Sequence, residues 1–156
     1  MIIADSTVLI TLINIDEFEI LKLFIEKVTI TNEVYTEISI QPSTKKFIDK
    51  EIAKGFITVK PYKNRQLFKE INFILDAGEA SSITLALEEN LPLIIDEKKG
   101  RKFAKAKGVE VIGLVGILRY LYVEKILNHK RSKEIIDKLN HSDFRISQKL
   151  LEIILS

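Results

Sequence analysis

The sequence contains no cysteine. This absence excludes disulfide bonds, and it excludes zinc or iron–sulfur sites whose ligands are thiolates. No apolar run approaches the roughly 20 residues that a membrane-spanning helix needs, so no membrane association is expected. The first residues, MIIADSTVLI, include neither a basic leader nor a small-residue cleavage site. They are not expected to form a signal peptide, and the expected location is the cytoplasm.

Glycine-rich phosphate-binding loops are missing as well. The six glycines form neither a GxGxxG motif nor a Gly-rich loop that ends in Lys-Ser or Lys-Thr. The tripeptide Asp5-Ser6-Thr7 lacks the second aspartate of a DxD nucleophile motif. A small-molecule phosphohydrolase or nucleotide-binding α/β domain is therefore a weaker hypothesis. A Ser-His hydrolase is also poorly supported, because His129 and His141 have the polar neighbours typical of surface positions.

An excess of charge of one sign is also lacking. The chain has 24 Lys+Arg against 22 Asp+Glu, a net charge of +2, which does not by itself indicate a nucleic-acid partner. The basic residues are unevenly distributed, because residues 98–107, KKGRKFAKAK, carry six of them and no acid. On charge alone, this segment is typical of a solvated helix face.

Short apolar runs alternate with helical patterns along the chain. The runs at 2–4, 28–31, 56–59, 93–95 and 109–112 predict buried strands. Strands that alternate with helices predict an α/β fold with a parallel sheet covered by helices on both faces. A length of 156 residues predicts one domain over 1–156. The apolar final segment, 144–156, predicts a short C-terminal helical extension that packs on the body or on a second copy, as in a homodimer.

Two segments match the capping-box pattern at helix starts. Asp16 with Glu19 predicts one helix start, and Asp76 with Glu79 predicts another. In the second case the pattern gives Glu79 a structural explanation that competes with any functional one. Asp5 has a similar alternative, because it stands where a strand is followed by a helix and an aspartate there is commonly a cap.

Four acids nevertheless stand where sites form in open α/β sheets. Asp5 and Asp96 directly follow predicted strands, while Glu37 and Glu79 lie on neighbouring predicted helices. Ligands bind such sheets beyond the carboxyl ends of the strands. If the strands of Asp5 and Asp96 are neighbours, all four carboxylates can face one pocket. A hard divalent cation such as Mg²⁺ or Mn²⁺ would offset their mutual repulsion.

Such a centre favours a phosphodiester substrate. Bound Mg²⁺ or Mn²⁺ activates water and neutralises the charge that develops on a transferring phosphate. The basic segment begins directly after the last acid, so its first cations are placed to hold a phosphate backbone beside the metal. These predicted nucleic-acid-binding residues are Lys98, Lys99, Arg101 and Lys102.

Five segments together carry a family resemblance. They are IIADSTVLITL, VTITNEVYTEI, LDAGEASSITLAL, LPLIIDEKKGRKFAKAKGVEVIGLVGIL and FRISQKLLEIIL. In this order, over nearly the whole chain, they resemble the PIN domain, specifically its compact prokaryotic group with a GEA helix and a final RIS-plus-Leu helix. One segment alone is weakly specific, whereas the ordered set is quite specific. The resemblance implies a PIN-like (Rossmann-like) α/β/α sandwich.

The resemblance also implies an activity and its residues. PIN domains are associated with metal-dependent ribonuclease activity, frequently as toxins neutralised by a partner antitoxin protein. By position, the implied catalytic acids are Asp5, Glu37, Glu79 and Asp96. Asp5, Glu79 and Asp96 are the implied ligands of Mg²⁺ or Mn²⁺, and Ser6 is expected to give polar support. The expected function is therefore hydrolysis of RNA by an endoribonuclease.

The sequence departs from the family pattern at two positions. Many PIN domains have a further acid two residues beyond the last one, where this chain has Lys98, which leaves open whether a second metal ion binds. Glu79 stands where many relatives use Asp, which lengthens one arm of the site. The alternative is a catalytically weak or inactive PIN-like module that binds RNA or a protein partner.

Overall fold

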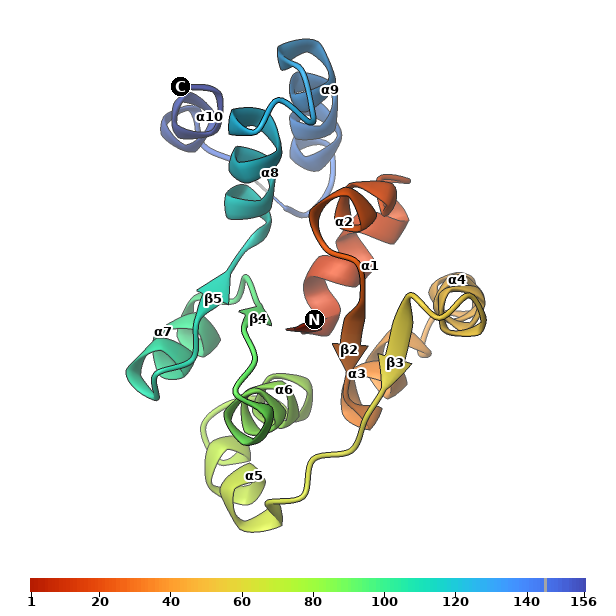
Figure 1. The fold of residues 1–156 in the computed structure, drawn as a ribbon, viewed down its shortest axis with the longest axis vertical. Coiled ribbons are helices and arrows are strands. Elements are labelled where there is room, and N and C mark those ends of the chain that lie inside the picture. Colours follow the sequence, from red (N-terminus) through yellow and green to blue (C-terminus); the bar gives the residue numbers. More distant parts are fainter. Residues whose placement is uncertain (145) are drawn as a thin grey trace.

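The computed structural model describes residues 1–144 and 146–156, so Arg145 of the final segment lies outside the described residues. Figure 1 shows the arrangement of the elements. In chain order they are β1 (Ile2–Ala4), α1 (Ser6–Asn14), α2 (Glu19–Phe24), β2 (Val28–Ile30), α3 (Asn32–Ile38), α4 (Pro42–Ala53), β3 (Ile57–Val59), α5 (Arg65–Asn72), α6 (Ala77–Glu89), β4 (Leu93–Ile94), α7 (Lys98–Ala106), β5 (Val111–Ile112), α8 (Leu114–Val123), α9 (His129–Asn140) and α10 (Gln148–Leu155).

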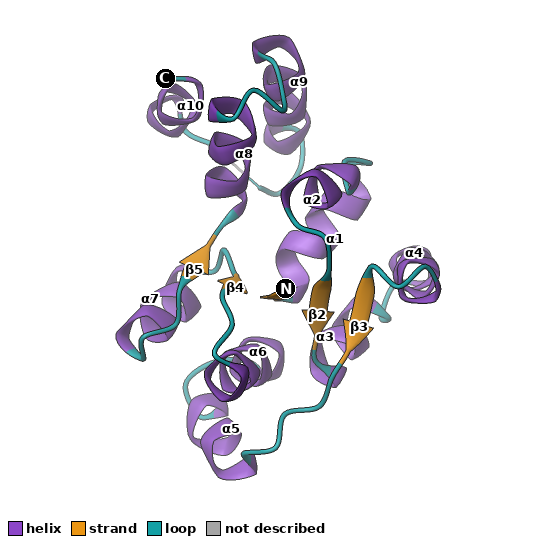
Figure 2. Ribbon diagram, viewed as in Figure 1, coloured by secondary structure: helices purple, strands orange, loops and turns teal. Residues whose placement is uncertain are grey.

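The strands form one parallel sheet in the order β3-β2-β1-β4-β5. In the register, Ile3 pairs with Thr29 on one side and with Leu93 on the other. Helices surround the sheet (Figure 2). The predicted α/β class with a helix-covered parallel sheet is therefore confirmed.

The sheet separates two hydrophobic cores. Side chains alternate between the faces of a strand, so Ile2 and Ala4 enter one core while Ile3 enters the other. The first core also contains residues of α1–α4 and α8–α10, and the second contains residues of α5–α7. The two faces of β1 are therefore both buried, which explains why its sequence is a continuous apolar run.

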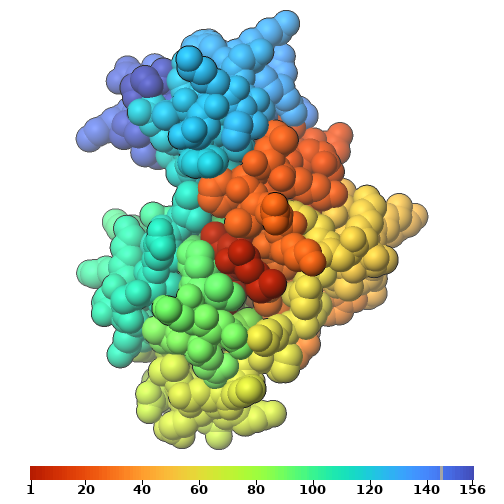
Figure 3. Space-filling model, in the orientation of Figure 1, coloured from red at the N-terminus to blue at the C-terminus, as the bar shows by residue number. Residues whose placement is uncertain are grey.

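The central strand, β1, places its carboxyl end in the middle of one sheet edge. Figure 3 shows the N-terminal end of the chain, in dark red, between the segments that flank it; Met1 is exposed, whereas the residues of β1 are buried. Beyond the carboxyl end, the Asp5 N–H donates to Ile94 O at 2.9 Å. This hydrogen bond holds the Asp5 backbone against the end of β4.

The C-terminal helices form an extension on one side of the sheet (Figure 1). Helix α10 packs against α8, where Arg119 Nη1 donates to Ser156 O at 2.6 Å and to Ile154 O at 3.3 Å. The final helix thus packs on the body of its own chain. Within the described part of the chain, no helix is long and apolar enough to cross a membrane.

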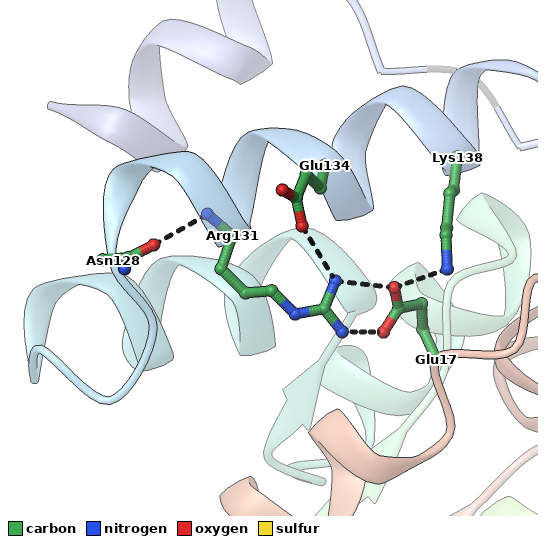
Figure 4. Close-up of polar contacts among 5 residues, drawn as sticks. All are labelled: Glu17, Asn128, Arg131, Glu134 and Lys138. Carbon is green, nitrogen blue, oxygen red and sulfur yellow. Dashed lines mark hydrogen bonds and ion pairs between the residues drawn. The ribbon is translucent and has the colours of Figure 1, made fainter.

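An ion-pair cluster around Glu17 fastens this extension to the N-terminal half (Figure 4). Glu17, in the loop before α2, is only 2% exposed and accepts hydrogen bonds from Arg131 and from Lys138 Nζ (2.9 Å), both on α9. The predicted capping box at Asp16 is wrong. Asp16 has a φ of 57° and belongs to the end of α1, because its N–H donates to Ile13 O and the Glu17 N–H donates to Leu12 O, as in a left-handed helix C-terminus; α2 begins only at Glu19.

Replacing Glu17 by Gln tests the strength of this fastening. Burial alone would raise the pKa of Glu17, but the hydrogen bonds and charges of Arg131 and Lys138 outweigh it and lower the pKa. The charged form is therefore stabilised in the folded protein, and this contribution is lost as pH falls below about 4.5 through the folded pKa. We expect Glu17→Gln to lower the free energy of unfolding by roughly 1–3 kcal/mol at pH 7, and by much less at pH 3, in urea titrations.

Glu134→Gln is the matched control, because Glu134 pairs with the same arginine at 3.6 Å but is 51% exposed. We expect it to change the free energy of unfolding by less than roughly 0.5 kcal/mol. Equal losses in the two variants, or a loss in Glu17→Gln that is the same at pH 3 and pH 7, would contradict this account of the cluster.

Candidate active site

The carboxyl edge of the sheet brings the predicted acids into one neighbourhood. Strands β1 and β4 are parallel neighbours, so Asp5 and Asp96 leave the sheet at the same edge. Helix α3 begins at the same edge, and its capping residue Thr31 shares a 2.7 Å hydrogen bond with Ser81 of α6. This contact fixes the start of α3 against α6. Helix α3 carries Glu37 and α6 carries Glu79, so the contact also brings these two acids near each other.

Asp5 lies at the centre of this neighbourhood. Its side chain forms no capping hydrogen bond with α1, and its Oδ1 is buried without a hydrogen-bond partner among the described residues. Burial raises the pKa of Asp5 to about 7; the Ser6 N–H opposes this rise, and the charges of Glu37, Asp76 and Glu97 add to it. A helix cap does not explain this aspartate.

Glu79 is the second buried carboxylate. It lies in the first turn of α6 and is 6% exposed, and its Oε2 also has no hydrogen-bond partner within the described ranges. Burial raises the pKa of Glu79 to about 9, and the side chains of Asp76 and Glu97, together with the charge of Asp5, contribute to the rise. Without a cation, Glu79 therefore keeps its proton at neutral pH.

Glu37 reaches the same place from α3. The Ser6 hydroxyl donates a short hydrogen bond to Glu37 Oε2, which gives Ser6 a defined contact in the site. Burial raises the pKa of Glu37, the Ser6 hydroxyl and the Gly78 N–H oppose this, and the charges of Asp76 and Glu33 add to the rise. Glu37 is thus held between the start of α1 and the start of α6.

Two further acids that were not predicted as site residues join this group. Asp76 caps α6 by accepting from Glu79 N at 2.9 Å, as the capping-box pattern predicts, and Glu97 caps α7 by accepting from Gly100 N at 2.6 Å. Both also raise the pKa of Asp5 and of Glu79, so their carboxylates serve the helix starts and the cluster together. Their position one residue before a helix was the available sequence signal, and it indicated only a cap.

Asp96 is bound at the start of α8. Both of its carboxylate oxygens accept from Leu114 N at 3.2 Å, at the start of α8. Burial raises the pKa of Asp96, while the Leu114 N–H and the charge of Arg101 oppose the rise. The structure therefore brings Asp5, Glu37 and Glu79 together but directs Asp96 to α8, because unpaired helix N–H groups attract a carboxylate. Glu97, the next residue, contributes to the cluster through Glu79.

A family model described as a PIN domain matches residues 1–156, the whole chain. The chain belongs to the PIN domain family. PIN domains are generally nucleases and typically use divalent metal ions. A search of the curated proteins found no match.

Three glycines of this PIN domain make room for its carboxylates. A Cβ added to Gly78 would overlap the carboxyl group of Glu37, and one added to Gly113 would overlap that of Asp96. A Cβ added to Gly100 would lie 2.5 Å from Glu79 Oε2. Each glycine stands at the start of a helix, where it lets a carboxylate approach the backbone closely.

The basic helix α7 borders the cluster. Lys98, Lys99 and Lys102 are exposed, as a phosphate-binding role requires. Arg101 is only partly exposed, and its Nη1 donates to Ile95 O at 3.0 Å beside Asp96. Arg101 therefore acts on the end of β4 and on Asp96, while the three lysines form the outer rim.

The cluster has the donor chemistry of a divalent-cation site. Within residues 1–144 and 146–156, no lysine or arginine forms an ion pair with Asp5, Glu37 or Glu79. In the same ranges, no group of three or more acidic or histidine side chains is already arranged to hold a metal ion. The unpartnered Asp5 Oδ1 and Glu79 Oε2 are hard oxygen donors of the kind that Mg²⁺ and Mn²⁺ prefer. The residues therefore fit such an ion by chemistry, with side-chain adjustment on binding.

The raised pKa values predict an unusual dependence of stability on pH. A folded protein that holds protons which the unfolded chain releases loses stability as pH rises, here from about 4 towards 9. In EDTA, we therefore expect wild type to be less stable at pH 8 than at pH 5.5. Asp5→Asn should raise the free energy of unfolding by roughly 1–3 kcal/mol at pH 8 and flatten the pH dependence.

Urea titrations at several pH values would measure this effect, with Glu110→Gln as the control because Glu110 is exposed and outside the cluster. The control should leave the curve of stability against pH unchanged. A wild type that gains stability between pH 5.5 and pH 8 would contradict the raised pKa values of the cluster. So would an Asp5→Asn variant that is less stable than wild type at pH 8.

A double-mutant cycle tests the close approach of Glu37 to Gly78. We expect Gly78→Ala to destabilise the protein by roughly 1–3 kcal/mol, because the new methyl group overlaps the Glu37 carboxyl. In a Glu37→Ala background the same change should be nearly neutral, because the obstructing group is gone. An equal loss in both backgrounds would show that Gly78 is needed for another reason.

Proposed function

We propose that this PIN domain is a metal-dependent endoribonuclease that hydrolyses RNA phosphodiester bonds with Mg²⁺ or Mn²⁺. The observation that carries the proposal is a pair of buried oxygens, Asp5 Oδ1 and Glu79 Oε2, which have no hydrogen-bond partner among the described residues and lie beside three further carboxylates. Such a group is unfavourable by itself, because burial and mutual repulsion both oppose ionisation. A divalent cation removes both difficulties.

The residues divide into holding and supporting roles. Asp5 and Glu79 supply the innermost oxygens for the ion, and Glu97 supplies one from the rim. Glu37 is kept in place by the Ser6 hydroxyl and the Gly78 N–H, on the α3 side of the cluster. An ion bound there would lower the pKa of a water molecule and offset charge on the phosphate.

Asp96 takes a different role in this proposal from the one implied by the family resemblance. Its carboxylate is bound by Leu114 N and lies beside Arg101, which in turn binds Ile95 O. We therefore assign Asp96 to positioning: it holds the end of β4, the start of α8 and Arg101 together. Glu97, the next residue, is thereby directed towards Glu79.

The exposed lysines of α7 supply the contact with RNA. Lys98, Lys99 and Lys102 lie just beyond Glu97, so a phosphate backbone that crosses the cluster would meet them next. Each contact with a phosphate releases counterions and makes binding depend on salt. Arg101 is added to this set only if its guanidinium leaves Ile95 O.

The proposed biological setting is a toxin–antitoxin pair in the cytoplasm, and its support is the family resemblance. In that setting a partner antitoxin protein would cover the cluster or the α7 rim. Homodimer formation also belongs to this proposal. Growth arrest on expression of wild type, but not of Glu79→Gln, is the result expected of a toxin.

Cleavage of single-stranded RNA with Mn²⁺ tests the activity. We expect Glu79→Gln to lower the rate by about 100-fold or more, since an ion held less tightly forfeits several kcal/mol of stabilisation. Glu97→Gln should be more severe than Asp96→Asn, because only Glu97 joins the cluster. Glu110→Gln is the control and should cleave like wild type.

Three outcomes would count against parts of this proposal. A wild type that binds RNA but does not cleave it with either ion would favour the catalytically inactive module. Cleavage that survives in EDTA would remove the metal from the proposal. An Asp96→Asn variant that loses far more activity than Glu97→Gln would return Asp96 to the group of ligands.

A further inference from the structure

A polar pocket lies at the same sheet edge as the acid cluster, on its β3 side. It has a volume of about 350 Å³ and is lined by Asn32, Glu33, Thr36, Pro61, Tyr62 and Arg65. This volume lies at the small end of the roughly 300–1,000 Å³ range of ligand sites. The lining comes from α3, from the loop between β3 and α5, and from Arg65, the first residue of α5.

The loop wall of the pocket is firmly held. The Glu88 carboxylate, near the end of α6, accepts from the backbone N–H groups of Lys63 (2.9 Å) and Asn64. Lys60 and Glu89 form an ion pair at 2.7 Å across the same boundary. The loop is thus fixed to α6 before any ligand binds, which lowers the entropy lost on binding.

Tyr62 supplies an aromatic wall with a fixed orientation. Its ring stacks on Phe68 with centroids 4.8 Å apart, and its hydroxyl donates to Glu33 Oε2 at 2.8 Å. Burial and then Glu33 raise the pKa of Tyr62 to about 12, which extends the pH range over which the hydroxyl is a donor. The Tyr62 hydroxyl therefore aims the Glu33 carboxylate within the pocket.

The polar groups of the pocket match a base better than a phosphate. Glu33 is an acceptor with a negative charge, which repels a phosphate but accepts hydrogen bonds from two adjacent N–H groups. Arg65 lies close enough to Tyr62 to influence its hydroxyl, and an arginine binds O6 and N7 of guanine in a bidentate manner. Guanine offers both features, two adjacent N–H donors on one edge and two acceptors on the other.

The pocket adjoins the acid cluster through one turn of α3. Glu33 and Glu37 are four residues apart, on one helix face, with Cβ atoms roughly 5–6 Å apart. The charge of Glu33 contributes to the raised pKa of Glu37, as expected for two carboxylates one helical turn apart. A base in the pocket would therefore belong to a nucleotide beside the cluster.

We infer that this pocket binds an unpaired guanine base of the RNA substrate, with Glu33 on the Watson–Crick edge, Arg65 on O6 and N7, and Tyr62 as the aromatic wall. This inference rests on the proposed function, because it names the base next to the bond that the acid cluster cleaves. Single-stranded RNA is recognised in this way, through splayed bases, aromatic faces and base edges. Binding of guanine in this pocket would make the protein selective for the base near the cleavage site.

Nucleotide binding in EDTA tests the pocket without any cleavage. The probes are 5′-GMP and 5′-AMP, and the readout is the movement of backbone amide signals in NMR spectra of the ¹⁵N-labelled full chain. We expect GMP to bind about 10-fold or more tightly than AMP, with the largest movements at Asn32, Glu33, Thr36, Tyr62 and Arg65. Equal affinity for the two nucleotides, or movements confined to α7, would overturn the inference.

Variants separate the base contact from a general loss of structure. Glu33→Gln should remove the preference for GMP over AMP, and Tyr62→Phe should weaken it, because the ring remains while the hydroxyl that aims Glu33 is lost. Glu70→Gln, at an exposed position of α5 outside the pocket, is the matched control and should bind both nucleotides as wild type does. A Glu33→Gln variant that keeps the full preference for GMP would overturn the assignment of the base edge.

Mapping of cleavage products distinguishes failure of this inference from failure of the nuclease proposal. We expect cuts beside guanine in wild type, and cuts without base preference in Glu33→Gln. Cleavage with no base preference in wild type would contradict guanine binding in the pocket but support the proposed nuclease activity. Selective binding of GMP by a protein that never cleaves RNA would support guanine binding in the pocket and contradict the nuclease activity.

Discussion

The repulsion among buried carboxylates at the carboxyl edge of β1 is the constraint on which the rest of this structure depends. Asp5 and Glu79 each bury an oxygen without a partner among the described residues, and burial is the largest cause of their raised pKa values. The packing of α6 against β1 and α3 forces this proximity, because α6 carries Glu79 and Asp5 directly follows β1. A fold that kept these groups only for stability would have paired or replaced them.

Several residues around the cluster have two roles, one in the site and one in stabilising a helix start. Asp76 and Glu97 cap helices and also contribute charge to the cluster, so the start of each helix is stabilised by a carboxylate that the site uses. The glycines at 78 and 100 open the space that this arrangement requires. Asp96 uses the start of α8 in the same manner, and the Glu17 cluster fastens the extension that follows α8.

Much of this arrangement could be predicted from local patterns. The strands of Asp5 and Asp96 appear as apolar runs that end in an acid, so their shared edge follows from the fold class. The direction of each side chain could not be predicted. Asp96 faces α8 because Leu114 N lies there and Gly113 leaves room, 18 residues along the chain. Similarly, the position of the Glu17 side chain depends on its contact with Arg131, which is 114 residues away in the sequence. No local sequence pattern could predict that contact.

The most direct test of the central claim is the number of protons released when Mn²⁺ binds, measured by calorimetry at pH 7 in buffers of different ionisation enthalpy. Carboxyl groups with pKa values of about 7 and about 9 are partly or fully protonated at that pH, so an ion that binds them must displace protons. The account predicts release of about one proton or more per ion, and a smaller release in Glu79→Gln. Binding without proton release, or no binding at millimolar Mn²⁺, would contradict it.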